Sequence, residues 1–245
     1  MTKNTIHTTL AAAALAGLIL TTGCAAPQAP QNTQIATTTT TPTTPSSAGP
    51  AVSSGTATPA PETPQAPALE TFTFPDGHVS FTHPAGWTVN TRPGPALDAE
   101  AQKTSFHATV HDASGAEVAS VFSGMYGDGA AGPARRTVLD HAPVPGISPA
   151  AGEATEFGFA YDEYPGTADP AHYFMDVRRA GEFLAPDGSS GSNQVMLPNG
   201  VLTASVVFGG PVSKAAFETP AAAEAWMGSE QYRQLKAMLL SLTYQ

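Results

Sequence analysis

"TSFHATVHDASGAEVASVFSGM", residues 104–125, carries the clearest β-hairpin pattern in the chain and decides its fold class. In the first half, apolar and polar residues alternate, so one face of the strand is apolar and the other carries hydroxyl and imidazole groups. "ASG" at 113–115 supplies a turn, and the second half returns as another alternating strand. This stretch predicts a half-buried antiparallel pair.

Other parts of the chain repeat the same pattern on both sides of this hairpin. Turn residues such as "PDG" at 75–77 and "YPGTADP" at 164–170 separate further alternating runs. A polar loop is expected at 185–200. The predicted strands are residues 69–74, 78–83, 153–163, 171–180 and 201–209, together with one that begins at Trp87.

The end of the chain shows helical spacing instead. Thr219 followed by Pro220 fits a helix N-cap and first position, and Gly228–Ser229 divides the segment into two possible helices. An apolar stripe follows at Tyr232, Leu235, Met238, Leu239 and Leu242. Strands in succession followed by an amphipathic C-terminal helix predict an α+β fold with a mainly antiparallel β-sheet packed with helices.

The start of the chain has the three-part pattern of an export signal. A short polar stretch with Lys3 precedes an apolar run from Leu10 to Leu20, and small residues lead to Cys24. The run spans about eleven residues, against roughly twenty for a membrane-crossing helix. The resemblance to a bacterial lipoprotein signal implies that residues 1–23 are removed and that Cys24 is lipidated, although Thr21 stands where the usual motif has leucine. Secretion with a free thiol is the alternative.

A tether is predicted to separate Cys24 from the folded domain. Residues 24–68 are rich in Thr, Pro, Ala and Ser, with Glu62 as the one charged residue. Such a segment has too little apolar surface to offset the entropy of ordering, so it is expected to be disordered. Residues 69–245 are then one globular domain of ordinary size.

The charge of the chain limits its partners. Nine of the ten basic and all twenty acidic residues follow Cys24, so that part carries a formal charge of −11. This charge argues against nucleic acid or anionic lipid as an electrostatic partner.

A resemblance to a known fold rests on two stretches and on the hairpin strands between them. "FTFPDGHVSFTHPAGWTV" at 72–89 and "YRQLKAMLLSLTY" at 232–244 resemble the Mog1/PsbP-like fold, notably its actinobacterial LpqN-type lipoproteins. The resemblance implies an α/β/α sandwich in an accessory, assembly or binding protein, without a shared catalytic set. Only residues 94–103 could supply the early helix of that fold.

Catalytic chemistry has one candidate set. "GSSGS" at 188–192 lacks the spacing of a nucleophile elbow. Asp162, Glu163 and His172 could form an envelope hydrolase site if the fold brought them together. We expect a protein that is not an enzyme and has no cofactor.

Metal binding is a second alternative. His107 and His111 lie four residues apart, which on a strand separates them by roughly 13 Å. A zinc site would draw on His78, His83, His141 and His172, and a calcium site on Asp162, Glu163 and Asp169. Ordinary surface or hydrogen-bonded groups are the simpler interpretation, and no metal ligands are predicted.

Three conspicuous features are expected to be structural. Trp87 follows a turn, where it can anchor the core or line a pocket. The pairs Arg135–Arg136 and Arg178–Arg179 would each place one side chain on either sheet face, and surface charges are the expected outcome. The functional prediction is a lipoprotein held on the outer, extracytoplasmic face of the cell membrane, whose domain binds an envelope component or partner protein.

Overall fold

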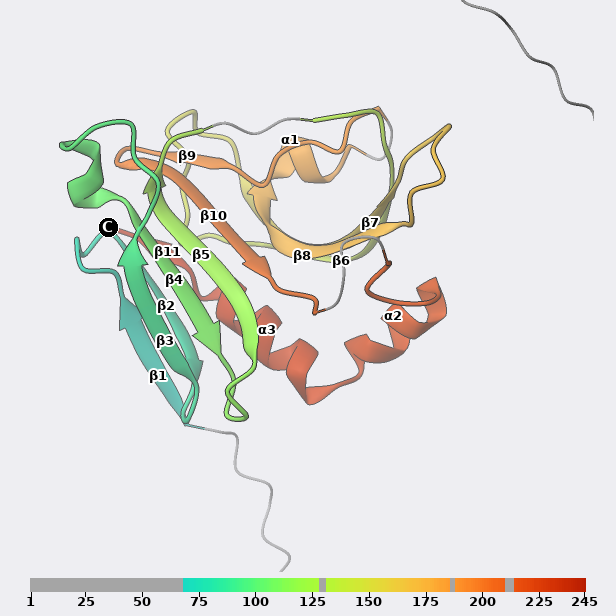
Figure 1. Ribbon diagram of the computed structural model, residues 1–245, viewed down its shortest axis with the longest axis horizontal. Helices are drawn as coiled ribbons and strands as arrows, with labels where there is room; N and C mark the ends of the chain where they lie inside the picture. The colour runs from blue at the N-terminus through green and yellow to red at the C-terminus, as the bar shows by residue number, and fades with distance from the viewer. Residues whose placement is uncertain (1–67, 128–130, 186–187, 210–213) are drawn as a thin grey trace, which may run out of the picture. The chain divides into compact units, whose positions relative to one another are not determined.

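The hairpin predicted at residues 104–125 is present in the computed structural model, which describes residues 68–127, 131–185, 188–209 and 214–245 (Figure 1). Its strands are β4 (Phe106–His111) and β5 (Glu117–Met125), and they pair antiparallel. Asp112 holds the turn, since its carboxylate accepts the backbone N–H of Ser114 at 2.8 Å. The sequence pattern therefore predicted this element correctly.

Among the described residues, the strands form two antiparallel sheets. The large sheet has the order β3-β4-β5-β10-β8-β7-β6, with β9 beside β10, and the small sheet has the order β1-β2-β11. The other strands are β1 (Leu69–Thr73), β2 (Val79–Pro84), β3 (Thr88–Pro93), β6 (Arg135–Pro143), β7 (Thr155–Glu163), β8 (His172–Arg179), β9 (Val195–Leu197), β10 (Gly200–Val206) and β11 (Thr243–Tyr244). The predicted α+β class with a mainly antiparallel sheet is thus confirmed. Strands β3 and β6 are the edges of the large sheet.

Two helices near the C-terminus cover one face of the large sheet. They are α2 (Pro220–Met227) and α3 (Glu230–Leu240), and the expected break between them is confirmed at Gly228–Ser229. Thr219 and Ser229 cap the two helices by accepting backbone N–H groups. The predicted stripe is buried at Tyr232, Leu235, Met238, Leu239 and Leu242. A single core joins this stripe to the apolar faces of both sheets.

Trp87 belongs to this core. Its side chain is 7% exposed and packs within the main hydrophobic cluster, as expected for a core anchor. The small sheet is tied to the end of α3, because the backbone N–H of Thr82 donates to Ser241 Oγ at 2.8 Å. The described residues belong to one compact unit.

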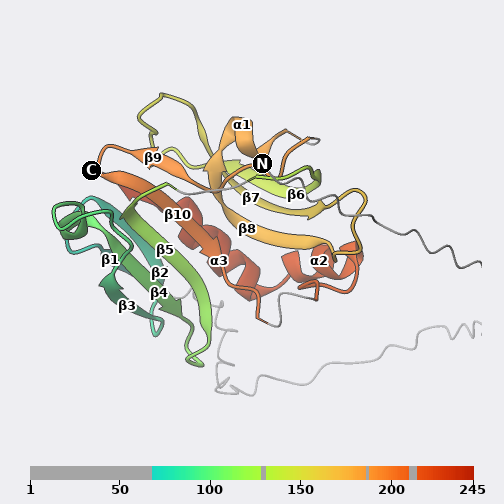
Figure 2. The ribbon, with the colours of Figure 1, turned by 45° about the horizontal axis from the view of Figure 1, so that its top comes forward.

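The opposite face of strands β6, β7 and β8 carries a second, smaller core. Helix α1 (Ala180–Phe183) lies on this side, and α2 and α3 lie on the other (Figure 2). Phe183 packs there with Ala160 and Phe174. Gly158 makes this approach possible, because a Cβ atom at that position would lie 2.1 Å from the Phe183 ring. The sheet is therefore covered, in part, on both faces.

Several elements differ from the sequence predictions. Strand β6 was not predicted, because "RRTVLDHAP" has no clear alternation of apolar and polar residues. Its polar side chains find their partners only in the folded protein. Strand β9 lies inside the loop expected at 185–200, and β11 follows the last helix. The segment at 94–103 forms only a short 3-10 turn, η1 (Ala101–Thr104).

A partly buried polar contact joins α3 to the edge strand β6. The Asp140 carboxylate accepts hydrogen bonds from the Tyr232 hydroxyl and the Lys236 ammonium. Burial alone raises the pKa of Asp140, but these hydrogen bonds together outweigh it, so its pKa lies below the ordinary value. Burial and the nearby carboxylate raise the pKa of Tyr232. The contact therefore favours ionised Asp140 and neutral Tyr232.

Asp140→Asn should lower the free energy of unfolding by about 1–3 kcal/mol at pH 7, as expected for a hydrogen bond to a charged group. A folded pKa below the unfolded value of about 3.9 stabilises the protein above that pH, and the contribution disappears as the pH falls through the folded pKa. Urea unfolding should therefore show the difference from the original protein at pH 7 and a smaller one at pH 3. Glu224→Gln, on the exposed side of α2, is the control. A difference that does not change with pH would contradict this assignment.

Candidate functional site

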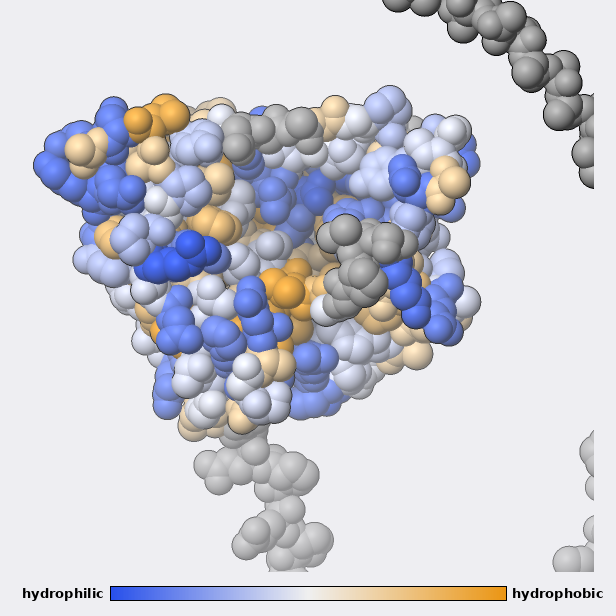
Figure 3. Space-filling view, in the orientation of Figure 1, coloured by the Kyte–Doolittle hydropathy of each residue, from blue (hydrophilic) through white to orange (hydrophobic). Residues whose placement is uncertain are grey.

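A large cavity opens where strands β8 and β10 meet. These strands pair only at Ser205 and Asp176 within the described residues, whereas β7 and β8 pair along their whole length. The cavity has a volume of about 860 Å³, within the range of about 300–1,000 Å³ typical of ligand sites. Figure 3 shows the hollow on this face of the protein, with hydrophilic residues inside it.

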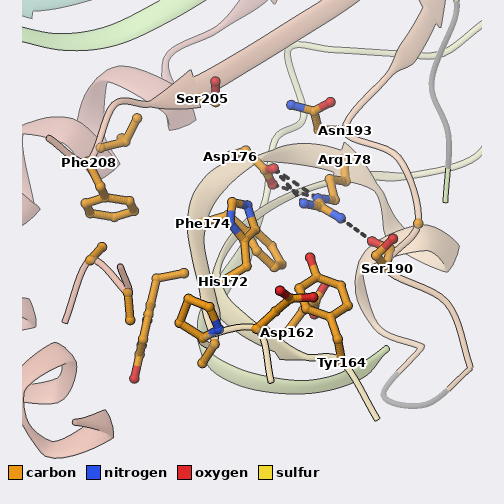
Figure 4. Close-up of a pocket in the computed structure, with 18 of the residues that line it drawn as sticks. Asp162, Tyr164, His172, Phe174, Asp176, Arg178, Ser190, Asn193, Ser205 and Phe208 are labelled. Carbon is orange, nitrogen blue, oxygen red and sulfur yellow. Dashed lines mark hydrogen bonds and ion pairs between the residues drawn. The ribbon is translucent and has the colours of Figure 1, made fainter. Parts of the chain in front are cut away.

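Strand β8 supplies the floor of the cavity. Alternate residues of a strand point to the same face, so His172, Phe174, Asp176 and Arg178 all lie on the cavity side. The residues between them point into the main core, where Met175 and Val177 are buried. Figure 4 shows the four side chains together, with Ser205 from β10 and Asn193 from the preceding loop nearby.

Asp176 and Arg178 form a buried ion pair on this floor. Arg178 Nε donates to Asp176 Oδ1 at 2.9 Å, and Nη2 donates to Oδ2 at 2.9 Å (Figure 4). Nη1 donates to the backbone oxygen of Ser190 at 2.8 Å. The two side chains are only 3% and 8% exposed. The pair therefore lies at the base of the cavity, almost out of contact with solvent.

A second buried pair lies directly beside the first. Arg136 of β6 donates from Nε and Nη2 to the two oxygens of Asp162, both at 2.8 Å. Its remaining N–H groups donate to the backbone oxygens of Glu182, Phe183 and Ser190, so all five donors are engaged. Arg136 thus fastens α1 and the loop at 188–194 to the sheet.

Both arginines lie over the ring of Phe174. The guanidinium carbon of Arg178 is 3.9 Å from the centre of the Phe174 ring, and that of Arg136 is 4.9 Å away. A cation over an aromatic face is favourable, and more so when the cation is desolvated. The arginines are therefore fixed by ring stacking as well as by their carboxylates.

Burial shifts the proton equilibria of this region. Desolvation raises the pKa of Asp176, even though Arg178 and Arg136 act in the opposite direction. Burial also raises the pKa of Tyr164 on the cavity wall, with a further contribution from Asp162. The site as a whole pairs each buried cation with a buried anion.

The proposed catalytic set is not assembled as a hydrolase would need. Asp162 and His172 lie opposite each other on β7 and β8, but both carboxylate oxygens of Asp162 are held by Arg136. Glu163 is exposed and follows Asp162 on the strand, so it points to the other face. Within the described residues, no hydrogen bond joins His172 to a carboxylate.

The histidines considered for zinc are dispersed through the described part of the chain. His78 contacts the Gln245 backbone oxygen, His83 contacts its neighbour Pro84, and His141 lies 3.4 Å from a Glu156 oxygen. His107 stacks on Phe122 with ring centres 3.9 Å apart, and His111 contacts Asn90. No group of three His, Cys, Asp or Glu residues close enough to hold a metal occurs in the described residues, including Asp162, Glu163 and Asp169. Cys24 lies outside them.

The arginine pairs correct one expectation. As predicted, each pair divides between the two sheet faces, but Arg136 and Arg178 are buried and not surface charges. Their burial is possible because each has an aspartate on the same sheet face. Asp162 lies on β7, next to the strand of Arg136, and Asp176 lies on β8, the strand of Arg178. Asp176 was missed by sequence reasoning. The available signal was its spacing of two residues from Arg178, which places both on one face of a strand.

Comparisons of the chain with protein-family models, curated proteins and solved structures gave no significant match. None of the helices in the described residues has the length and apolar character needed to cross a membrane. The cavity and its buried charges are therefore the features from which a function can be inferred.

Removing one partner of a buried ion pair leaves an uncompensated charge, which costs about 3–5 kcal/mol. Asp162→Ala should therefore lower the free energy of unfolding by about that amount, since Arg136 would remain buried. Glu163→Ala changes the next carboxylate along the strand, which is exposed, and should cost less than about 1 kcal/mol. Urea denaturation followed by circular dichroism measures both values. Equal effects of the two substitutions would contradict the structural role of Asp162.

Proposed function

We propose that the chain is a lipoprotein anchored through Cys24 to the outer face of the cell membrane, and that its domain is a non-catalytic binding or accessory module. The ligand would be an envelope component, or a part of a partner protein, that enters the cavity between β8 and β10. Residues 24–68 would serve as the tether between the anchor and the domain. The resemblance to LpqN-type proteins of the Mog1/PsbP-like fold is consistent with an accessory or binding role.

One observation carries the binding proposal. Arg178 is 7% exposed and lines the cavity, yet its Asp176 and Ser190 contacts engage only three of its five N–H groups. The remaining two N–H groups have no hydrogen-bond partner among the described residues. Buried donors are normally satisfied, so a ligand that enters the cavity would find donors already fixed in place.

The carboxylates of the region support a structural role over catalysis. A general base needs an oxygen free to take a proton from the substrate. Arg136 instead holds both oxygens of Asp162 in a bidentate pair. Asp176 is likewise bound to Arg178.

The membrane anchor is tested by Cys24→Ala. Because the lipid is attached at the thiol, this variant should be exported but released into the soluble fraction, whereas the original protein should stay with the membranes. A change of Cys24 removes both the anchor and its processing signal, so export is verified by protease accessibility in intact cells. Membrane retention at the original level, by variant molecules whose mass shows that the leader has been removed, would refute the anchor.

The cavity is tested by filling it. Asn193 lines the cavity from the loop before β9, so Asn193→Trp should obstruct it without removing a described hydrogen bond. The full chain isolated from its own envelope should carry a bound molecule, detectable by mass spectrometry after denaturation, and the variant should carry at least tenfold less. Asn90→Trp, on the exposed side of β3 and away from the cavity, is the control; it loses only the surface contact with His111 and should retain the bound molecule. Equal recovery from both variants would contradict binding in this cavity.

A further inference from the structure

The charges of the cavity restrict the ligand. Asp176 neutralises Arg178 and Arg136 neutralises Asp162, so neither arginine offers a net positive charge to an anion. Asp169 and Lys214 at the exposed margin are of opposite sign. The chain after Ala68 has nineteen acidic and nine basic residues, a formal charge of −10, which repels anions at long range. An uncharged ligand is therefore favoured.

The floor offers a donor and an acceptor side by side. Arg178 has two N–H groups that no described residue accepts. A carboxylate has about four acceptor positions. Among the described residues, Asp176 accepts from only two N–H groups, both of Arg178, so acceptor capacity remains. A hydroxyl group matches this arrangement because it can accept from the guanidinium and donate to the carboxylate at the same time. Charge-assisted hydrogen bonds of this kind are the stronger ones.

The walls continue the same chemistry. They carry hydroxyl and carboxamide groups, which both donate and accept, from Ser192, Asn193, Gln194 and Ser205. Phe208 adds an apolar ring at the wall, and this half-buried ring packs against Phe217 and Trp226 with centres 5.4 Å apart. A sugar has hydroxyl groups around its rim and apolar C–H faces, so polar walls beside an aromatic ring suit it.

We propose that this cavity binds a short, uncharged glycan, with Arg178 and Asp176 hydrogen-bonded to hydroxyl groups of one sugar and Phe208 packed against a sugar face. This assignment rests on the proposed binding function and names its ligand class. The cavity volume of about 860 Å³ allows more than one sugar unit.

The test uses the full chain, purified in a detergent without a sugar head group, on an array of neutral and acidic glycans. Neutral glycans should bind and sialylated or sulfated ones should not. Affinity for the best neutral glycan is then measured by calorimetry, with Trp226 fluorescence as a second signal because its ring lies 5.4 Å from Phe208. Signal from acidic glycans alone, or from no glycan at all, overturns the proposal.

Variants separate direct contact from a loss of folding. Asn193→Ala removes one neutral hydrogen bond and should weaken binding about two- to tenfold. Arg178→Lys keeps the charge opposite Asp176 but loses the planar donor fork, so binding should fall at least tenfold while circular dichroism stays unchanged. Asn90→Ala is the matched control and should bind normally. Unchanged affinity in both cavity variants would place the glycan elsewhere and overturn the assignment.

A peptide ligand is the competing outcome. Suppose that an uncharged Ala-Ser-Thr hexapeptide bound to the original protein but not to the Asn193→Trp variant, and that no glycan bound. The glycan assignment would then fail and the binding function would stand. If neither probe bound and no molecule copurified with the full chain, both would fail.

Discussion

The backbone oxygen of Ser190 receives hydrogen bonds from two buried arginines, and the second face of the sheet depends on this contact. Arg136 and Arg178 come from strands β6 and β8, so one loop oxygen connects two strands that are not neighbours. Each arginine is charged and buried, which is costly unless it is paired. Asp162 and Asp176 supply the pairing from the same sheet face. The loop at 188–194 and the cavity wall are positioned as a result.

Much of the fold could be predicted from the sequence because most strands have one apolar face. The hairpin at 104–125, the pair at 153–180 and the capped helices after Thr219 all follow local rules of alternation, turn and capping chemistry. Strand β6 could not be predicted, because its inward residues include Arg136, whose partners lie at Asp162, Glu182 and Ser190. No local pattern shows that a charged side chain will be buried.

The candidate site shows the same limit. Asp162 and His172 were identified as chemistry-bearing residues and are indeed opposite each other on β7 and β8. The role of Asp162 depends on Arg136, which is 26 residues away from it in the chain. Sequence spacing revealed which side chains share a strand face, but the pairing of strands decides which charge neutralises which. The cavity between β8 and β10 arises from tertiary packing, so no short sequence motif predicts it.

The open sheet also has consequences for how the domain behaves beside other copies of itself. Among the strands of the described residues, the edge strands β3 and β6 each have a neighbour on one side only, which leaves a row of backbone groups without a strand partner. Both strands end on proline, at Pro93 and Pro143, and both carry charged residues, at Arg92 and Asp140. Proline and charge on an edge hinder the addition of another strand. Such edges discourage sheet-to-sheet aggregation where many copies are crowded together.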